Sequence, residues 1–202
     1  ASALAFGQPR VTDRAMETYS SEQARFRLTQ VVEGLREPWS FTFLPDGATL
    51  VTERTGALWL VRDRRVTEVS GVPEVAAVGQ GGLLDLALHP DFPTNGIVFL
   101  SFSDRYAFGV GTAVARARLE GDRLRDVEVI FRMNRSSAGG RHFGSRLVVG
   151  PDGLLYVTVG DRGQQDRAQD PGDHAGSVLR LELDGSIPRG NPFADGREGA
   201  PE

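Results

Sequence analysis

The chain contains no cysteine and no lysine, and all 23 of its basic residues are arginine. Without cysteine, the segment has no thiol nucleophile, no thiolate metal site and no disulfide. Without lysine, no side chain of the segment can form a Schiff base with a carbonyl substrate. These two absences exclude several common enzyme chemistries before any motif is considered.

Long apolar runs and basic patches are also missing. No run approaches the ~20 apolar residues that a membrane-spanning helix requires, and 25% charged with 40% hydrophobic residues is typical of a globular protein. The net charge of −4, with no arginine cluster interleaved with aromatic residues, argues against nucleic-acid binding. Nucleophile-elbow, dinucleotide, zinc-protease and EF-hand motifs are absent, which removes most hydrolase and nucleotide-binding interpretations.

Short apolar runs separated by Gly, Pro, Asp and Asn begin at Phe26 and predict strands rather than helices. The expected strands cover residues 27–32, 40–44, 49–53, 57–61, 83–88, 97–102, 112–119, 127–131, 147–149, 154–159 and 177–183. The polar stretch before them predicts an extended or mobile arm without a functional site. We expect an N-terminal arm over residues 1–25 and one β domain over residues 26–202.

Three segments repeat one pattern of apolar strand, Pro-Asp turn, second apolar strand and polar end. They span residues 40–54, 85–104 and 146–161. Their spacing is in the range of the four-stranded blades of a β-propeller. We therefore predict an all-β fold with about three four-stranded blades. Three blades are too few to close a ring, so the chain is expected to be truncated at its C-terminus; closure with a partner and a sandwich are the alternatives.

The turn Pro151-Asp152-Gly153 predicts a β-hairpin between the apolar runs 147–149 and 154–159. A three-residue loop with a bulge is the alternative and would change the parity. If Asp152 and Gly153 form a two-residue loop, Asp161 falls opposite Gly144. His142 then falls opposite Gly163, with its side chain on the same face as that of Asp161. Diagonal neighbours on one face of a hairpin can interact, so we expect contact at the open end of this hairpin.

A carboxylate beside an imidazole fixes its tautomer and favours its charged form, which is the arrangement of a general base. His142 and Asp161 are therefore candidate catalytic residues. A structural histidine bonded to a loop is the alternative for His142. The equivalent repeat positions of Asp161 hold Glu53 and Asp104, so a carboxylate there is partly a property of the repeat.

Three other polar residues need an interpretation. His89 precedes the Pro-Asp turn of the second repeat and is expected to serve that turn or the packing. His174 lies in a loop and could bind a ligand or cap a turn. Gln80 lies within four residues of which the other three are glycine, so it combines close backbone approach with a neutral donor and acceptor.

Four stretches of the sequence together resemble the glucose/sorbosone dehydrogenase family, the soluble pyrroloquinoline quinone (PQQ) sugar dehydrogenases. They are REPWSFTFLPDG at 36–47, GQGGLLDLALHPDF at 79–92, GGRHFGSRLVVGPDGLLYVTVGD at 139–161 and AQDPGDHAGSVLRLELDGSIPRGNPF at 168–193. The resemblance extends from about residue 27 to the end of the chain. It implies a six-bladed propeller of which this chain supplies the first three blades.

The resemblance also implies an oxidoreductase with assigned residues. In the family a histidine takes the proton from the C1 hydroxyl of an aldose while hydride passes to PQQ, which yields the lactone. His142 matches that base, Asp161 matches the acidic partner that orients it, and Gln80 matches a glutamine of the substrate pocket. Arg141 stands where glucose-oxidising members have Asp, which resembles the broader aldose dehydrogenase branch.

Cofactors and partners follow from the same resemblance. It implies PQQ and calcium, held mainly by residues beyond Glu202, so no cofactor-binding or metal residue is assigned and the segment alone is expected to be inactive. It further implies a sugar substrate, an artificial, cytochrome or quinone electron acceptor, a possible homodimer, and a periplasmic or secreted location. The small and apolar start of the chain, ASALAFG, also hints at export.

Two other functions remain open on the sequence alone. One is a non-catalytic propeller that binds a protein or a glycan. The other is a metal-dependent propeller lactonase, in which several carboxylates would surround a cation and His142 would lie outside the metal ligands.

Overall fold

The computed structural model describes residues 8–191, which form strands with two short helical segments. The first four-stranded sheet has the order β3 (Pro38–Phe43), β4 (Thr49–Glu53), β5 (Leu58–Arg62) and β6 (Arg65–Glu68). The second contains β7 (Leu83–Leu88), β8 (Ile97–Tyr106), β9 (Gly109–Glu120) and β10 (Arg123–Arg132). The third contains β11 (Gly144–Val149), β12 (Leu155–Val159) and β13 (Val178–Leu181). All pairings are antiparallel.

The three sheets lie beside one another as propeller blades, and the first strands of the sheets make the most extensive contacts between them. Strand β7 contacts both β3 and β11, so the second sheet lies between the first and the third. Each predicted Pro-Asp turn joins the first two strands of one sheet. The predicted all-β propeller fold is therefore confirmed.

Alternate side chains of β8 explain how the sheets pack. Val98 and Leu100 enter the core between the first and second sheets. Phe99 points to the other face and enters the core shared with the third sheet. Successive side chains of a strand point to opposite faces, and all three are fully buried. A continuous apolar run here therefore indicates a strand that is covered on both faces.

One buried carboxylate joins the first strands of all three sheets. Asp85 on β7 accepts hydrogen bonds from Ser40 Oγ at 2.6 Å, Arg146 Nη1 at 2.9 Å and the Leu147 backbone N–H at 2.8 Å. Ser40 lies on β3 and the other two residues lie on β11. Asp85 therefore fixes the relative position of the three sheets close to the start of β11.

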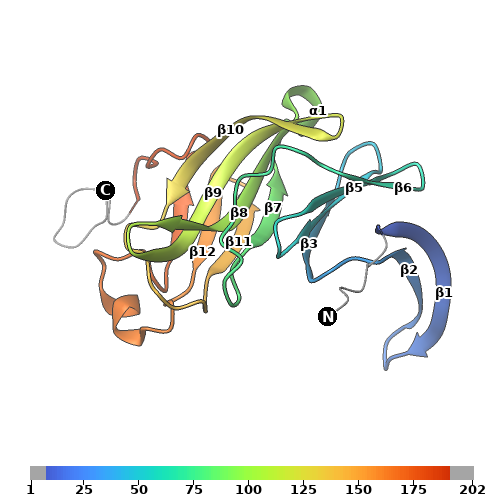
Figure 1. Ribbon diagram of the computed structural model, residues 1–202, viewed down its shortest axis with the longest axis horizontal. Helices are drawn as coiled ribbons and strands as arrows, with labels where there is room; N and C mark the ends of the chain where they lie inside the picture. The colour runs from blue at the N-terminus through green and yellow to red at the C-terminus, as the bar shows by residue number, and fades with distance from the viewer. Residues whose placement is uncertain (1–7, 192–202) are drawn as a thin grey trace, which may run out of the picture.

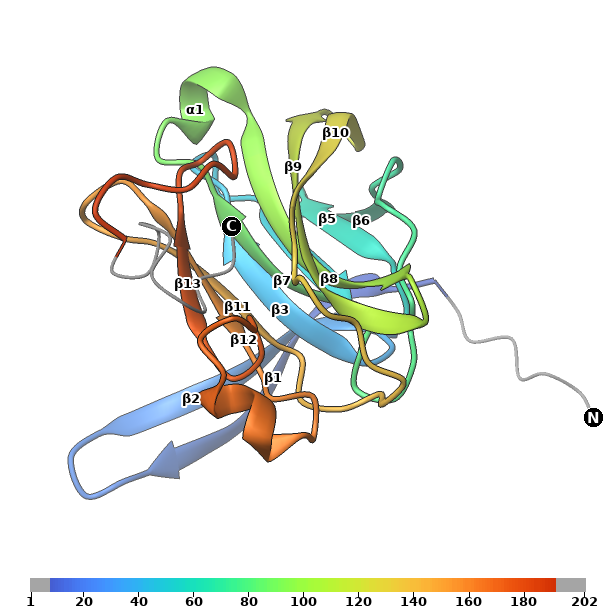
Figure 2. The same cartoon turned by 90° about the vertical axis from the view of Figure 1, so that its left-hand side faces the viewer.

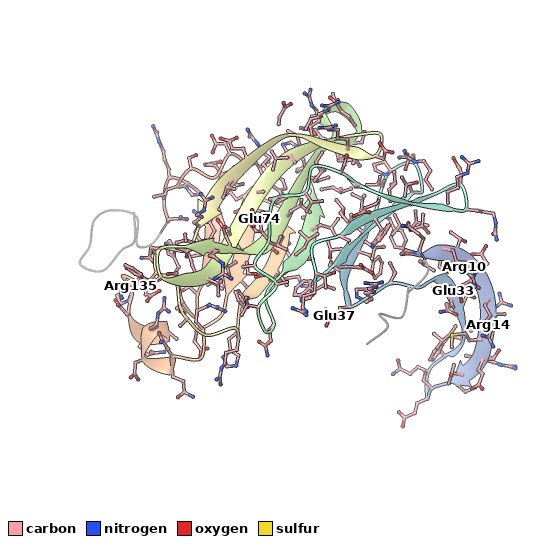
Figure 3. The ribbon with its side chains drawn as sticks, viewed as in Figure 1. Arg10, Arg14, Glu33, Glu37, Glu74 and Arg135 are labelled. Atoms are coloured by element: carbon pink, nitrogen blue, oxygen red, sulfur yellow. The ribbon has the colours of Figure 1, made fainter. Side chains whose placement is uncertain are left out.

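The N-terminal region differs from the predicted arm. β1 (Arg10–Ser20) pairs with β2 (Arg25–Glu33) in a two-stranded sheet that projects from the blades in both views (Figure 1, Figure 2). Arg10 and Glu33 form an ion pair of 2.5 Å between the two strands, and the labelled side chains lie together in Figure 3. The expected boundary after residue 25 falls inside this hairpin.

The other expected strands are present with small shifts at their ends. The sequence did not predict β1 or β6, and the third sheet has three strands within residues 8–191 rather than the four expected of a blade. α1 (Phe92–Asn95) fills the second Pro-Asp turn, and the 3₁₀ segment η1 (Gln165–Gln169) follows β12. No helix in residues 8–191 is long and apolar enough to cross a membrane.

Candidate active site

The β11–β12 turn has three residues instead of two. Gly150 N–H donates to Leu154 O at 2.8 Å, and Val149 pairs with Leu155. The three-residue alternative is therefore the one present, and the register expected from a two-residue loop does not hold. A register shift between Gly144 and Leu147 follows, so that Gly144 faces Val159 and not Asp161.

His142 and Asp161 nevertheless meet. Nδ1 of His142 lies 2.6 Å from Oδ1 of Asp161, and the two side chains are 50% and 23% exposed. His142 has a φ of 55°, a left-handed conformation that is rare for residues other than glycine. The imidazole is therefore open to a ligand while one of its nitrogens is bound to a carboxylate.

The charge state of Asp161 determines the tautomer of His142. The hydrogen bond from His142 and a second one from the Gly163 N–H at 2.7 Å lower the pKa of the Asp161 carboxyl below its usual range. Asp161 is thus a carboxylate at neutral pH and can only accept hydrogen bonds. A neutral His142 then carries its proton on Nδ1. Its Nε2 atom has no partner in the part of the chain that the structure describes.

Gln80 reaches the same place from the second sheet. The side-chain oxygen of Gln80 accepts the backbone N–H of His142 at 2.7 Å. The backbone N–H of Gln80 donates to the carbonyl oxygen of Gly140, also at 2.7 Å. The structure thus brings the three predicted site residues together. The carboxamide oxygen of Gln80 accepts this bond, and its NH₂ group, which has no partner within residues 8–191, can donate to a ligand.

Glycines allow these loops to approach so closely. A Cβ at Gly160, just before Asp161, would overlap the carbonyl group of His142. A Cβ at Gly79 would overlap the carbonyl group of Gly140. The loops around residues 80, 142 and 161 therefore contact through their backbones, which a larger residue would separate.

Two arginines that the sequence analysis missed support the loops. Arg54 donates through Nη1 to the carbonyl oxygens of Gly79 at 2.9 Å and Gly81 at 2.8 Å. Arg162 is buried and donates to the carbonyl oxygens of residues 139 and 141. Arg54 directly follows Glu53, and Arg162 directly follows Asp161. This shared position after a repeat carboxylate was the sequence signal that could have identified both arginines.

The remaining two histidines each accept a hydrogen bond from a backbone N–H and lie apart from His142. His89 Nδ1 accepts the N–H of Asp91 at 3.0 Å, which confirms its role in a turn. His174 Nδ1 accepts the N–H of Asn134 at 3.0 Å, and burial lowers the pKa of the ring. His174 also lines a pocket between β10 and the third sheet that does not include His142.

The carboxylates at the equivalent repeat positions have other partners. Glu53 accepts the backbone N–H of Arg36, and Asp104 forms an ion pair of 2.6 Å with Arg132. A carboxylate at this point thus recurs in all three sheets, and within residues 8–191 only Asp161 binds a histidine.

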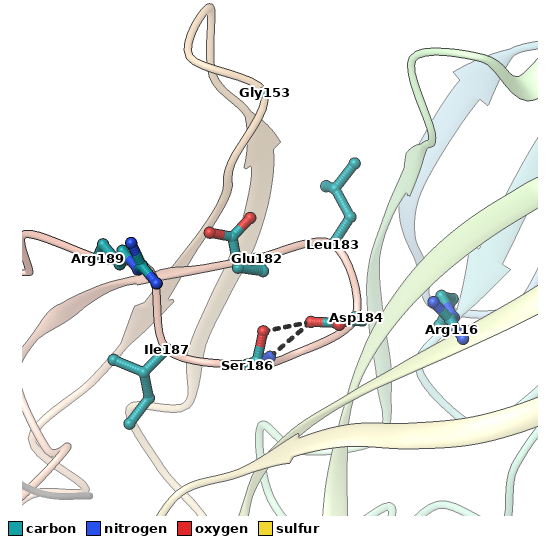
Figure 4. A pocket seen from close by; sticks show the side chains of 8 residues that line it. All are labelled: Arg116, Gly153, Glu182, Leu183, Asp184, Ser186, Ile187 and Arg189. Carbon is teal, nitrogen blue, oxygen red and sulfur yellow. Dashed lines mark hydrogen bonds between the residues drawn. The ribbon is translucent and has the colours of Figure 1, made fainter.

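Two other features are poor candidates for the active site. The pocket in Figure 4 is formed by the loop 182–189 with Arg116 and Gly153, and its Asp184 accepts two hydrogen bonds from Ser186. It contains no histidine. Among residues 8–191, no group of three or more histidine and acidic side chains is placed to hold a metal ion.

The fold and the site together define a β-propeller domain whose loops at one end of the sheets carry an exposed histidine–carboxylate pair. Residues 35–202 match the family model of Glucose / Sorbosone dehydrogenase. The chain therefore belongs to this family.

Relatives with described activities agree with that assignment. The chain is 41% identical to the aldose sugar dehydrogenase YliI of Escherichia coli over 165 residues, which are 79% of this chain and 44% of that protein. It is 30% identical to quinoprotein glucose dehydrogenase B of Acinetobacter calcoaceticus over 207 residues, which are 82% of this chain and 41% of that protein.

A solved structure gives the same result. The PQQ-bound form of an aldose sugar dehydrogenase from Streptomyces coelicolor superposes with a TM-score of 0.71 at 32% identity, over 83% of this chain and 49% of that chain. The chain thus spans about half the length of the relatives that it matches.

Proposed function

We propose that this chain forms the sugar-oxidising site of a PQQ-dependent aldose dehydrogenase, in which an aldose is oxidised at C1 to the lactone. One observation carries the proposal: the 2.6 Å contact between His142 and Asp161 leaves Nε2 of an exposed imidazole free to accept a proton. The family membership and the quinoprotein relatives support the reaction class.

The proposed mechanism assigns one role to each of three residues. His142 Nε2 takes the proton of the C1 hydroxyl group as general base. Asp161 fixes the Nδ1–H tautomer and stabilises the imidazolium that forms. Gln80 holds the backbone of His142 through its oxygen and offers its NH₂ group to a sugar hydroxyl.

PQQ, when bound, supplies the acceptor for the two electrons and the hydrogen that leave C1. The described residues fit such a group in part. His142 Nε2 and the Gln80 NH₂ group have no partner within residues 8–191, and the exposed Arg141 adds a cation that suits the carboxylates of the quinone. We propose that the other PQQ ligands and the calcium ligands lie in sequence outside this chain.

Two consequences belong to the same proposal. The 202-residue chain alone does not oxidise sugars with PQQ and calcium, because it supplies the base without most of the cofactor ligands. The natural protein is exported and passes its electrons to an external acceptor. The first statement is supported by the coverage of the aldose dehydrogenase relative, since this chain matches 44% of that protein.

The test uses the protein that carries this chain at its natural length. It is titrated with PQQ in the presence of calcium, and aldose oxidation is measured with a dye as acceptor in the wild type and in His142→Ala. Loss of a general base typically lowers the rate by ~10² to 10⁴. A rate that does not change in His142→Ala removes His142 from the mechanism. PQQ binding without oxidation of any aldose favours a binding propeller instead.

A further inference from the structure

Arg162 is a buried cation next to the candidate active site. It directly follows Asp161, and it is only 2% exposed. Its backbone has a φ of 58°, so it lies in the same left-handed region as His142. The side chain of Asp161 points outward to the imidazole of His142. The side chain of Arg162 points inward, beneath the segment that carries His142.

The guanidinium group of Arg162 contacts residues on both sides of His142. Nη2 donates to the carbonyl oxygen of Gly139 at 2.7 Å, and Nη1 donates to that of Arg141. The guanidinium carbon lies 3.5 Å from the ring centroid of Phe143, within cation–π distance. His142 is therefore the residue in the middle of a segment whose two neighbours are both held by Arg162.

Fold stability alone does not account for a cation in this position. Arg162 has no carboxylate partner at salt-bridge distance among residues 8–191, and its buried Nε–H has no hydrogen-bond acceptor there. Burial lowers the pKa of Arg162 to about 10, so the group remains charged at neutral pH. A buried charge without an ion-pair partner is costly, and its hydrogen bonds all go to the segment that presents His142.

The conformation of His142 supplies a reason for these bonds. Left-handed backbone is unfavourable for a residue with a Cβ, and it persists where surrounding contacts enforce it. Gln80 holds the backbone N–H of His142 from the second sheet. Arg162 holds the preceding carbonyl groups from the third sheet. The two side chains therefore fix the turn from both directions.

We propose that Arg162 is a positioning residue, whose two hydrogen bonds to the carbonyl oxygens of Gly139 and Arg141 hold the left-handed turn that presents His142 to Asp161. The catalytic consequence of this role rests on the proposed function. The structural consequence does not, because the contact between His142 and Asp161 exists without any ligand.

The first experiment follows the imidazole directly. ¹⁵N-labelled histidine in the natural-length protein without PQQ reports the tautomer of His142 by NMR, in the wild type, Arg162→Gln and Arg162→Lys. The wild type should show the proton on Nδ1. Arg162→Gln, which has fewer donors and no charge, should shift His142 to a mixture of tautomers, and Arg162→Lys should retain part of the wild-type signal.

Arg167→Gln is the matched control. Arg167 is also largely buried, but its guanidinium group binds Asp173 at 2.7 Å and 3.0 Å and does not bond to residues 139–143. This variant should lose stability while the His142 signal stays as in the wild type. A folded Arg162→Gln with the wild-type tautomer overturns the proposal. So does failure of both Arg162 variants to fold, because Arg162 is then a determinant of the fold.

The second experiment separates this proposal from the proposed function. In the natural-length enzyme with PQQ, Arg162→Gln should lower kcat by about 10²-fold with little change in KM, since a misplaced base affects the reaction step. A tautomer shift in the variant together with an inactive wild type rejects the function and supports the positioning role. Unchanged kcat and tautomer in an active enzyme reject the positioning role alone.

Discussion

Asp161 faces His142 because β11 contains a bulge. Near the turn Val149 pairs with Leu155, and this register, continued without a shift, would place Phe143 opposite Asp161. The shift between residues 144 and 147 moves the pairing by one residue, and the imidazole Nδ1 then lies 2.6 Å from the carboxylate. Bulges often redirect a side chain next to an active site, and here the bulge selects which residue meets the carboxylate.

Asp161→Asn tests the charge of the carboxylate while keeping its shape. An amide can accept from Nδ1–H or donate to Nδ1, so His142 should no longer be held in one tautomer. The rate of sugar oxidation should fall by ~10² to 10⁴, and histidine NMR should show the altered tautomer. Asp184→Asn is the control, because the pKa of this carboxyl is also lowered, by Ser186, in a loop that does not contact His142. Equal loss in both variants would contradict the role of Asp161.

Gly160→Ala tests the close approach of the two loops. The added Cβ would overlap the carbonyl group of His142, so the backbone must shift and the 2.6 Å contact should lengthen. We expect a loss of roughly 1–3 kcal/mol in the free energy of unfolding, measured with urea, together with an altered His142 tautomer. Gly153→Ala in the β11–β12 turn introduces strain without a neighbour within 4 Å. Gly153→Ala should lose stability and keep the wild-type tautomer of His142. An altered tautomer in Gly153→Ala with a wild-type tautomer in Gly160→Ala would show that the close backbone approach at Gly160 does not position His142.

The sequence predicted the repeats and the meeting of His142 with Asp161 for a physical reason. Pro-Asp turns and apolar runs encode local structure, and a turn of either length brings the same two flanks together. The bulge ends at Leu147, whose backbone N–H donates to Asp85 of the second sheet, and no local pattern reveals a contact between sheets. Arg162 was missed because it is buried, with a left-handed backbone that no local pattern indicated. A charged residue after a strand is ordinarily expected on the surface.

Asp85→Ala tests whether the hydrogen bonds of the Asp85 carboxylate hold the three sheets together. Removing a buried carboxylate that binds Ser40, Arg146 and the Leu147 N–H leaves these donors without their acceptor. Because the Arg146 side chain is 56% exposed and can turn to water, we expect a loss of roughly 2–4 kcal/mol rather than the full cost of breaking a buried pair. Urea unfolding measures it. Glu128→Ala is the control: it breaks the exposed ion pair of 3.0 Å with Arg116 and should cost less than ~1 kcal/mol. Similar losses of stability in Asp85→Ala and Glu128→Ala would contradict the role of Asp85 in joining the three sheets.

Tyr106 should make the protein less stable in alkali. Burial, followed by the nearby charge of Asp104, raises the pKa of Tyr106 to about 12, and its hydroxyl donates to Met133 O at 2.5 Å. The unfolded chain loses this proton near pH 10. The stabilisation is therefore complete below about pH 10 and is lost as the pH rises through 12.

Tyrosinate absorbance should show a group that titrates near pH 12 and is absent in Tyr106→Phe. The free energy of unfolding of this variant, measured with urea, should decline less between about pH 10 and pH 12 than that of the wild type. Tyr19→Phe, at an exposed site of the β1–β2 hairpin, should leave the alkaline decline as in the wild type. If the stability of Tyr106→Phe declines in alkali as much as that of the wild type, another group causes the effect.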